Sequence, residues 1–190
     1  RLYDPFYDKK ELLITRYKTL EINGRIDSKG EILEKISKVS LKKIIDFLKL
    51  NQIESVAICL INSYRNSLHE NQIVKEIKLK LPNIDFSISS EILPHIGEFE
   101  RMSSTVIDAY IKPAIRTYLN DLNNKIKNKK IDAPIFIMKS SGGLTTLDHA
   151  EQAPINMIES GPAAGVLAAR NCLNKKIFPN IIFAMANKYF

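Results

Sequence analysis

The stretch Val56-Ala-Ile-Cys-Leu-Ile61 decides how this sequence folds, because it is a continuous apolar run bounded by polar residues. Such a run is typical of a strand that is covered on both faces of a sheet. A helix is predicted next, from about His69 to Leu81, where Pro82 stops it. Ile84–Ser89 then predicts a short second strand. The order strand, helix, strand indicates a β-α-β unit with parallel strands and a right-handed crossover.

The residues before this unit predict a β-meander piece followed by a helix. Leu12–Asn23 is rich in β-branched and aromatic residues, and Asn23-Gly24 and Ser28-Lys-Gly30 are typical of turns. Leu41–Leu50 carries apolar residues at helical spacing, and Ser40 is the predicted N-cap.

The residues after the unit begin with a long predicted helix from about Glu98 to Lys127, which Pro113 should kink or divide. Two apolar stripes along it are expected to pack in the core: Met102, Val106, Tyr110, Ala114, Tyr118, Leu122 and Ile126, and beside them Ile107, Ile111, Ile115 and Leu119.

Ile135–Met138 is a further predicted strand, and the chain then continues with a helix over Gly161–Cys172 and a strand over Ile181–Met185. The alternation of helices and strands predicts an α/β fold with a mostly parallel sheet and flanking helices.

The composition is that of an ordinary globular protein. The 190 residues are 45% hydrophobic and 26% charged, which argues against a disordered chain, and the apolar runs are too short for a membrane span. Lys and Arg exceed Asp and Glu by 28 to 21, giving a net charge of +7. Only seven of these basic residues are Arg, and the densest basic run, Lys125–Lys130, lies at a predicted helix end. We therefore expect solvated lysines and neither a nucleic-acid nor a membrane partner.

Cysteine and histidine usage points to no metal and to a reducing cytoplasm. Cys59 and Cys172 form no CxxC pattern, and His69, His95 and His149 lie far apart without the spacing of metal ligands. A zinc site and a disulfide framework are not expected, and a cytoplasmic location follows as the default.

Two glycine-bearing segments are candidates for ligand binding. The first comprises Ser140, Ser141, Gly142 and Gly143, directly after the strand at Ile135–Met138. Glycines there let the backbone approach a ligand, and hydroxyl groups can bind phosphate, but a plain turn explains these residues equally well.

The second segment comprises Ser160, Gly161, Pro162, Ala163, Ala164 and Gly165. Ser160 is a natural N-cap and Pro162 suits a first helical turn. A helix start with so little side-chain bulk can face a nucleotide with the positive end of its dipole, or can pack closely on another helix. It is neither a Walker A loop nor a GxGxxG fingerprint.

Three blocks, in this order and spacing, resemble the hydantoinase A / 5-oxoprolinase family. They are Glu98-Phe-Glu-Arg-Met-Ser-Ser-Thr-Val-Ile-Asp-Ala-Tyr-Ile-Lys-Pro113, Met138-Lys-Ser-Ser-Gly-Gly-Leu144 and Ser160-Gly-Pro-Ala-Ala-Gly-Val166. Arg1–Asp4 and Val56–Glu70 look like the amino-terminal part of the same family. By this resemblance, residues 1–97 end the family's N-terminal region and residues 98–190 begin its core domain.

The resemblance implies an ATP-dependent enzyme that opens a cyclic amide, such as 5-oxoproline or a hydantoin, after phosphorylation of the amide oxygen. It implies ATP and Mg2+ as cofactors of the full-length enzyme and a partner subunit of the hydantoinase B type. It also implies part of the fold shared by actin, sugar kinases and heat-shock ATPases. In that fold a small-residue helix, here Ser160–Ala169, lines the hinge near the nucleotide, and Glu100 and Arg101 are candidates for the substrate side.

The sequence departs from the family pattern at two phosphate loops. No Asp-x-Gly-Gly-Thr segment is present near Arg1, and Phe183-Ala-Met-Ala-Asn-Lys188 stands where the family has Asp-Met-Gly-Gly-Thr. A β- and γ-phosphate cradle is therefore missing, and we expect an internal fragment that is inactive alone. The alternatives are an acetone-carboxylase-like subunit of the same superfamily, or a non-catalytic remnant or interaction module. No catalytic base can be named, because the serines lack a His–Asp pairing and the acidic residues near Arg101 also suit a first helical turn.

Overall fold

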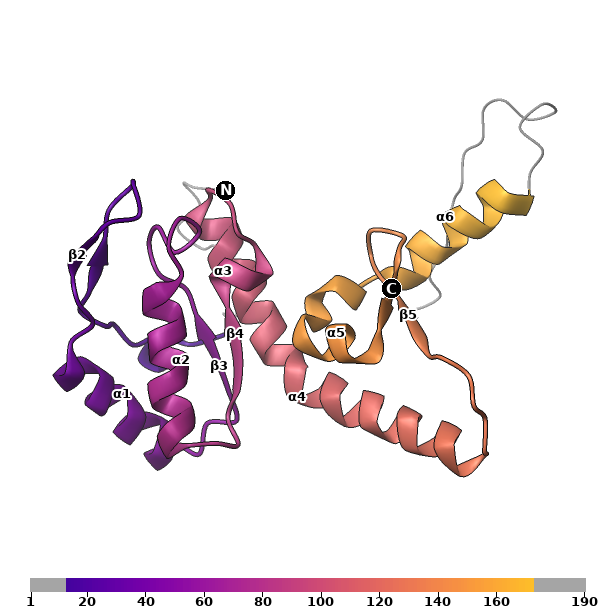
Figure 1. The fold of residues 1–190 in the computed structure, drawn as a ribbon, viewed down its shortest axis with the longest axis horizontal. Helices are drawn as coiled ribbons and strands as arrows, with labels where there is room; N and C mark the ends of the chain where they lie inside the picture. The colour runs from indigo at the N-terminus through magenta and orange to yellow at the C-terminus, as the bar shows by residue number, and fades with distance from the viewer. Residues whose placement is uncertain (1–12, 173–190) are drawn as a thin grey trace, which may run out of the picture.

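The parallel pair of strands β3 (Ser55–Ile58) and β4 (Asp85–Ile88) is the centre of the first half of the protein. A computed structural model describes residues 13–172 of the chain. Helix α2 (Leu68–Lys80) connects the two strands, so the predicted β-α-β unit is confirmed (Figure 1). Val56 lies opposite Phe86 in the register of the pair.

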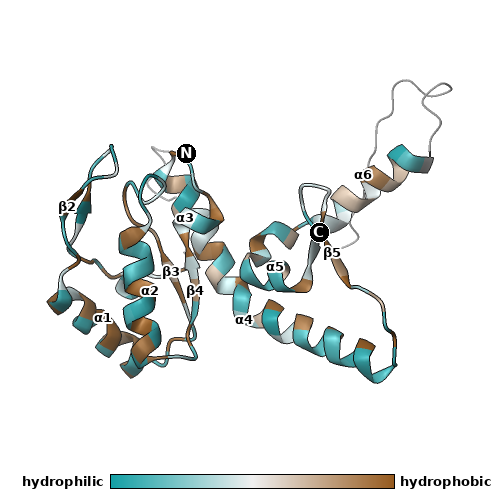
Figure 2. Cartoon of the chain, in the orientation of Figure 1, coloured by the Kyte–Doolittle hydropathy of each residue, from teal (hydrophilic) through white to brown (hydrophobic). Residues whose placement is uncertain are grey.

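The core of this half lies between the strands and helices α1 (Lys38–Leu50) and α2. Figure 2 shows hydrophobic residues along β3 and on both helices. Helix α1 begins three residues earlier than predicted, because the Ser37 hydroxyl accepts a hydrogen bond from the Ser40 backbone N–H and Ser37 is therefore the N-cap. The buried apolar side chains are Ile36, Leu41, Leu48, Ile58, Ile73, Ile77 and Ile88.

The N-terminal β piece is a short hairpin, displaced from the predicted position. Within residues 13–23 the only regular element is the 3-10 helix η1 (Arg16–Lys18). Strands β1 (Arg25–Ile26) and β2 (Ile32–Glu34) pair antiparallel. Their turn is fixed by Gly30, whose φ is 91°, and by the Asp27 carboxylate, which accepts hydrogen bonds from two backbone N–H groups. The β propensity of residues 12–23 predicted the wrong segment because this local turn sets the pairing.

Helix α4 (Glu98–Asn128) follows the short helix α3 (Ser89–Ile92) and joins the two halves of the protein. Pro113 lies inside α4 without dividing it, and the ribbon bends along its length (Figure 1). Helix α4 packs against β3 and β4 and also against elements of the second half.

The apolar stripes of α4 were expected in the core, and this expectation is wrong for several of their members. Met102, Tyr110 and Tyr118 are 48%, 64% and 59% exposed, and Ile107 is exposed as well. Ala109 and Leu119 are buried. The remaining buried side chains of α4 are polar or charged and are Arg101, Thr105, Asp108 and Lys112. Because these four recur at helical spacing, α4 turns a polar face toward the sheet.

The described part of the second half, up to Cys172, contains one antiparallel pair and three helical segments. Strands β5 (Phe136–Met138) and β6 (Leu144–Thr146) form the pair, followed by α5 (Leu147–Gln152), η2 (Pro154–Met157) and α6 (Ser160–Cys172). The fold is therefore α/β, with the parallel arrangement confirmed for β3 and β4 and an antiparallel one for β5. The strand predicted at Ile181–Met185 lies outside the described residues. In residues 13–172, no helix has the length and apolar character needed to cross a membrane.

Glu70 connects the loop that follows β3 with the start of α3, which follows β4. Its side chain is fully buried on α2. One carboxylate oxygen accepts hydrogen bonds from the Leu60 backbone N–H (3.0 Å) and the Ser89 hydroxyl (2.6 Å), and the other from the Ser90 backbone N–H (3.0 Å). Glu70 thus supplies the acceptors that these buried donors need.

We predict that Glu70→Ala lowers the free energy of unfolding by about 3 kcal/mol or more, because three donors to a charged group lose their acceptor. Urea denaturation of the purified chain measures this. The matched control is Glu76→Ala, at an exposed position of the same helix, which should change stability by about 0.5 kcal/mol at most. Equal losses in the two variants would contradict the assigned role.

His69 makes stability depend on pH. It is 4% exposed, its Nε2 finds no hydrogen-bond partner within residues 13–172, and burial lowers its pKa below the usual value of 6.5. The unfolded chain therefore binds a proton at a higher pH than the folded chain does. Stability contributed by neutral His69 is present above the unfolded pKa and is lost as the pH falls below it.

We predict that the urea concentration at the midpoint of denaturation decreases as the pH is lowered from about 7.5 to about 5.5. His69→Leu should reduce this dependence on pH. His95→Gln, at an exposed position, is the control and should keep it. An unchanged slope in His69→Leu would refute the assignment.

Candidate functional site

The first glycine-bearing segment is the turn of the β5–β6 hairpin. The Lys139 backbone N–H donates to the Gly143 carbonyl (2.7 Å), and the Gly142 N–H donates to the Lys139 carbonyl (2.9 Å). Gly142 has a φ of 86°, which a side chain would oppose. Ser140 and Ser141 are exposed on this turn. The segment is thus a tight hairpin turn with two accessible hydroxyl-bearing residues.

Ser140 fixes the turn to the chain that leads into α6. Its backbone N–H and its hydroxyl both donate to the Asn156 carbonyl, at 2.7 and 2.8 Å, and the hydroxyl also lies 2.5 Å from the Ile158 carbonyl. A side chain at Gly142 would meet Leu167 of α6 at 3.3 Å. The structure therefore brings the two glycine-bearing segments together, although about twenty residues separate them.

The second segment forms the first turns of α6. Ser160 is already helical, so it is the first residue of α6 and not its predicted cap. The residue before it, Glu159, has a φ of 58°, a backbone conformation that non-glycine residues rarely adopt. Apart from its chain neighbours and the backbone of α6 itself, a Cβ added to Gly161 would meet no atom of residues 13–172 within 4 Å. The start of α6 is therefore open at this position, whereas close helix packing would fill it.

This arrangement suits an anionic ligand. The first N–H groups of a helix have no partner within the helix, and the dipole favours negative charge at this end. The neighbouring turn adds hydroxyl groups, and Lys139 lines a pocket of about 200 Å³ beside it, together with His149 and Asn156. Within residues 13–172, no group of three or more His, Cys, Asp or Glu side chains gathers as a metal site would require.

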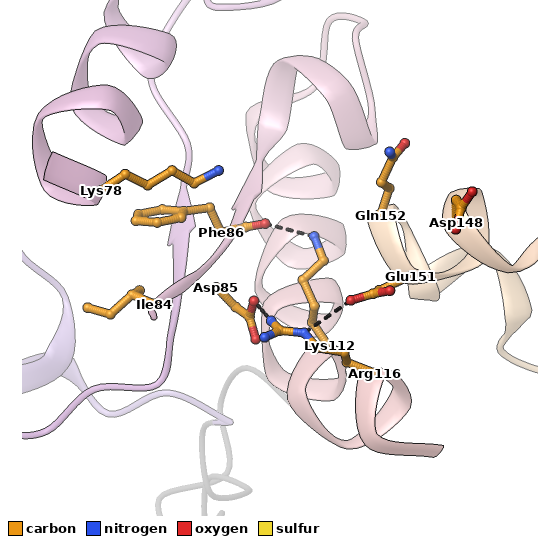
Figure 3. Close-up of a pocket in the computed structure, with 9 residues that line it drawn as sticks. All are labelled: Lys78, Ile84, Asp85, Phe86, Lys112, Arg116, Asp148, Glu151 and Gln152. Atoms are coloured by element: carbon orange, nitrogen blue, oxygen red, sulfur yellow. Dashed lines mark hydrogen bonds and ion pairs between the residues drawn. The ribbon is translucent and has the colours of Figure 1, made fainter. Parts of the chain in front are cut away.

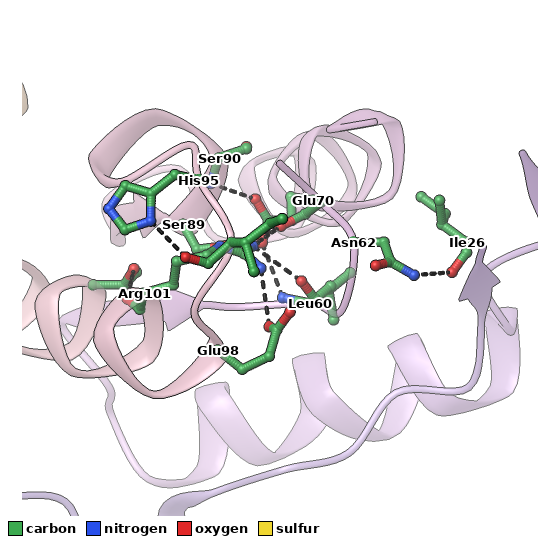
Figure 4. A network of polar contacts seen from close by, with 12 residues as sticks. Ile26, Leu60, Asn62, Glu70, Ser89, Ser90, His95, Glu98 and Arg101 are labelled. Carbon is green, nitrogen blue, oxygen red and sulfur yellow. Dashed lines mark hydrogen bonds and ion pairs between the residues drawn. The ribbon is translucent and has the colours of Figure 1, made fainter. Parts of the chain in front are cut away.

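Arg101 lies elsewhere, in the first turn of α4, where its side chain contacts the segments that follow β3 and β4 (Figure 4). It is fully buried. One terminal nitrogen pairs with Glu98 (2.9 Å), and the other contacts the Leu60 carbonyl (3.1 Å), Ser89 (2.5 Å) and the hydroxyl of Ser63. Its terminal nitrogens are thus engaged within this chain, while Glu100 is exposed.

Cys59 borders the same cluster and is not suited to act as a nucleophile. Burial raises the pKa of its thiol above the usual value, which the hydrogen bond with Ser89 offsets only in part. The thiol is therefore protonated at neutral pH, and the thiolate is the reactive form.

A second pocket, of about 460 Å³, lies between β4, α4 and α5 (Figure 3). Most charged side chains in its lining form ion pairs with other charged side chains. Arg116 pairs with Asp85 and, at 3.2 Å, with Glu151. Lys112 donates to the Phe86 carbonyl (2.7 Å) and pairs with Asp108 (3.3 Å). Lys78 and Asp148 also line the pocket, and they add one positive and one negative charge. The lining therefore favours neither an anionic nor a cationic ligand.

The sequence predictions missed the buried polar residues that connect these regions. Asp108 and Lys112 were overlooked because the adjacent apolar stripe was taken as the core-facing side of α4. The signal was present: Arg101, Thr105, Asp108 and Lys112 follow one another at intervals of four, three and four residues. Glu70, Ser63 and Ser89 give no comparable pattern, because only the β-α-β fold brings them together.

Two family models match most of the chain. The hydantoinase/oxoprolinase N-terminal region matches residues 1–81, and the hydantoinase/oxoprolinase model matches residues 101–185. An uncharacterised protein of Methanocaldococcus jannaschii is 39% identical over 168 residues, which are 88% of this chain and 25% of that protein. The 5-oxoprolinase of Saccharomyces cerevisiae is 32% identical over 155 residues, 81% of this chain and 12% of that enzyme.

Two solved structures share the fold. The ATP-dependent caprolactamase of Pseudomonas jessenii has a TM-score of 0.83 and 28% identity, over 93% of this chain and 25% of that one. Acetone carboxylase, in a nucleotide-free structure, has a TM-score of 0.76 and 20% identity, over 91% of this chain and 24% of that one, so it shows the fold alone. The chain thus spans a quarter or less of each of these proteins. The family models cover the turn, the start of α6, β3 and α2, and the chain belongs to the hydantoinase/oxoprolinase family.

Proposed function

We propose that this chain contributes part of the nucleotide-binding body of an ATP-dependent enzyme that opens a cyclic amide. The observation that carries the proposal is the open helix start at Gly161 beside the turn at Ser140–Gly143. ATP would place its phosphates against this surface, and the nucleotide phosphorylates the amide oxygen so that water can attack the carbonyl carbon.

The names of the relatives favour an amide as the substrate. 5-Oxoprolinase and caprolactamase are both named after cyclic amides, and these relatives are 32% and 29% identical to the chain. The likeness to acetone carboxylase lies at 20% identity and bears on the fold only. We therefore favour hydrolysis of a lactam or hydantoin ring over carboxylation of a ketone.

We assign the residues of the site as follows. Ser140–Gly143 and Ser160–Gly165 face the nucleotide, whose phosphates bring Mg2+ with them. On the substrate side, Glu100 is exposed. Arg101 is buried and acts indirectly, by holding the loop after β3 and the start of α3 in place. A partner subunit of the hydantoinase B type is part of the proposal, supported by the name of the relative caprolactamase subunit alpha.

We predict that Gly161→Asp weakens the binding of Mg-ATP to the intact enzyme about tenfold, because a carboxylate at the helix start repels the phosphates. The fold should tolerate the change, since the position is open and an acidic residue in a first turn stabilises a helix. Isothermal titration with Mg-ATP measures the dissociation constant.

The matched control is Gly161→Asn, which has the same size and no charge and should retain most of the affinity. If the aspartate and asparagine variants bind Mg-ATP equally well, the start of α6 does not face the phosphates. If the wild-type enzyme binds no Mg-ATP, the proposed function itself is wrong.

We also propose that the 190-residue chain alone does not hydrolyse ATP. Residues Phe183–Lys188 contain neither a carboxylate to organise Mg2+ nor a glycine to let the backbone approach phosphate. Phosphate release by the purified chain should equal that of a heat-denatured sample. Magnesium-dependent turnover above that level would contradict this prediction.

A further inference from the structure

Asp108 is a buried carboxylate that contacts both halves of the protein. It is fully buried on α4. Its Oδ2 accepts a hydrogen bond from the Ser87 hydroxyl of β4 (2.6 Å) and lies 3.3 Å from Lys112 Nζ. Its Oδ1 accepts a hydrogen bond from the Ile155 backbone N–H of η2 (2.9 Å). One side chain therefore links the parallel pair to the segment that precedes α6.

The link continues from η2 to the proposed nucleotide surface. The next carbonyl after Ile155, that of Asn156, accepts both hydrogen bonds from Ser140. Two residues later the Ile158 carbonyl lies 2.5 Å from the Ser140 hydroxyl, and Glu159 follows in its left-handed conformation before α6 begins. An unbroken series of contacts thus runs from Asp108 through η2 to the turn and to the start of α6.

The backbone N–H groups of η2 need hydrogen-bond acceptors from outside this short helix, and Asp108 supplies one of them. The segment Pro154–Met157 is a 3-10 helix of four residues, so most of its backbone bonds must be satisfied from outside. A carboxylate is a strong acceptor for a backbone N–H and can bind two further donors at the same time. Lys112 compensates its charge, which makes burial tolerable.

Building on the proposed function, we propose that Asp108 is a positioning residue for the nucleotide site. By holding the Ile155 N–H, it sets where η2 lies, and η2 in turn sets the turn at Ser140–Gly143 and the start of α6. Asp108 does not touch the nucleotide. Its effect on ATP binding passes through the hydrogen bond to Ile155.

The test compares Asp108→Ala with Asp108→Asn in the intact enzyme. Alanine removes the acceptor for Ile155, whereas the asparagine amide oxygen can keep it. The asparagine NH2 group stands where Oδ2 was, so this variant loses the charge that faces Lys112 and the acceptor for the Ser87 hydroxyl. We expect Asp108→Ala to weaken Mg-ATP binding about tenfold and Asp108→Asn to keep the wild-type value within about threefold. Hydrogen–deuterium exchange of residues 154–160 should accelerate in the alanine variant and stay near the wild-type rate in the asparagine variant.

The matched control is Thr105→Val, one turn earlier on the same buried face. In the described part of the chain, the Thr105 hydroxyl donates to the Arg101 carbonyl of the same helix (2.7 Å). This variant should lose stability without changing Mg-ATP affinity or exchange at residues 154–160. If affinity falls in step with thermal stability across all three variants, Asp108 is merely structural and the proposal is overturned.

Two outcomes separate this proposal from the one it rests on. If the wild-type enzyme binds no Mg-ATP, the proposed function fails. Asp108 then positions no nucleotide site, even if hydrogen–deuterium exchange shows that it holds η2. If wild type binds Mg-ATP but exchange at residues 154–160 is unchanged in Asp108→Ala, the positioning role fails. Should Asp108→Ala not fold, Ser140→Ala tests the far end of the same link, and unchanged exchange at residues 154–160 there also overturns the proposal.

Discussion

The burial of a polar face of α4 is the constraint on which the rest of the structure depends. A helix of this length would ordinarily turn its apolar side to the sheet. Here the side chains next to β3 and β4 carry charge, and each must find partners to offset the loss of hydration. Those partners are hydroxyl and carbonyl groups of β4 and of the loops after both strands. The four side chains on this face are Arg101, Thr105, Asp108 and Lys112.

These contacts explain why the two halves of the protein hold a defined relation. Ser87 of β4 binds Asp108, and Ser89, the first residue of α3, binds Arg101. Both contacts lie on the same face of α4, two helical turns apart. The helix is thereby fixed to the parallel pair along its first half. The same helix also packs against η2 and α5. The position of the proposed nucleotide surface therefore depends on how α4 packs on the β-α-β unit.

The exposed apolar residues of α4 lie on the opposite side of the helix from its buried polar face. Tyr110 and Tyr118 form part of a stripe that faces away from the described core. A helix that is polar toward its own sheet and apolar toward solvent reverses the usual arrangement. The chain spans only a quarter of the caprolactamase structure with which it shares its fold.

The sequence by itself determined the β-α-β unit, the tight turn at Ser140–Gly143 and the small-residue helix start, because apolar runs, glycines and prolines act locally. It also carried the family resemblance, which the family models confirm. Only the tertiary structure decided which side of α4 is buried. Local periodicity shows two faces of a helix but not which one meets the sheet, and Glu70, Ser89 and Asp108 become partners only when distant segments pack together.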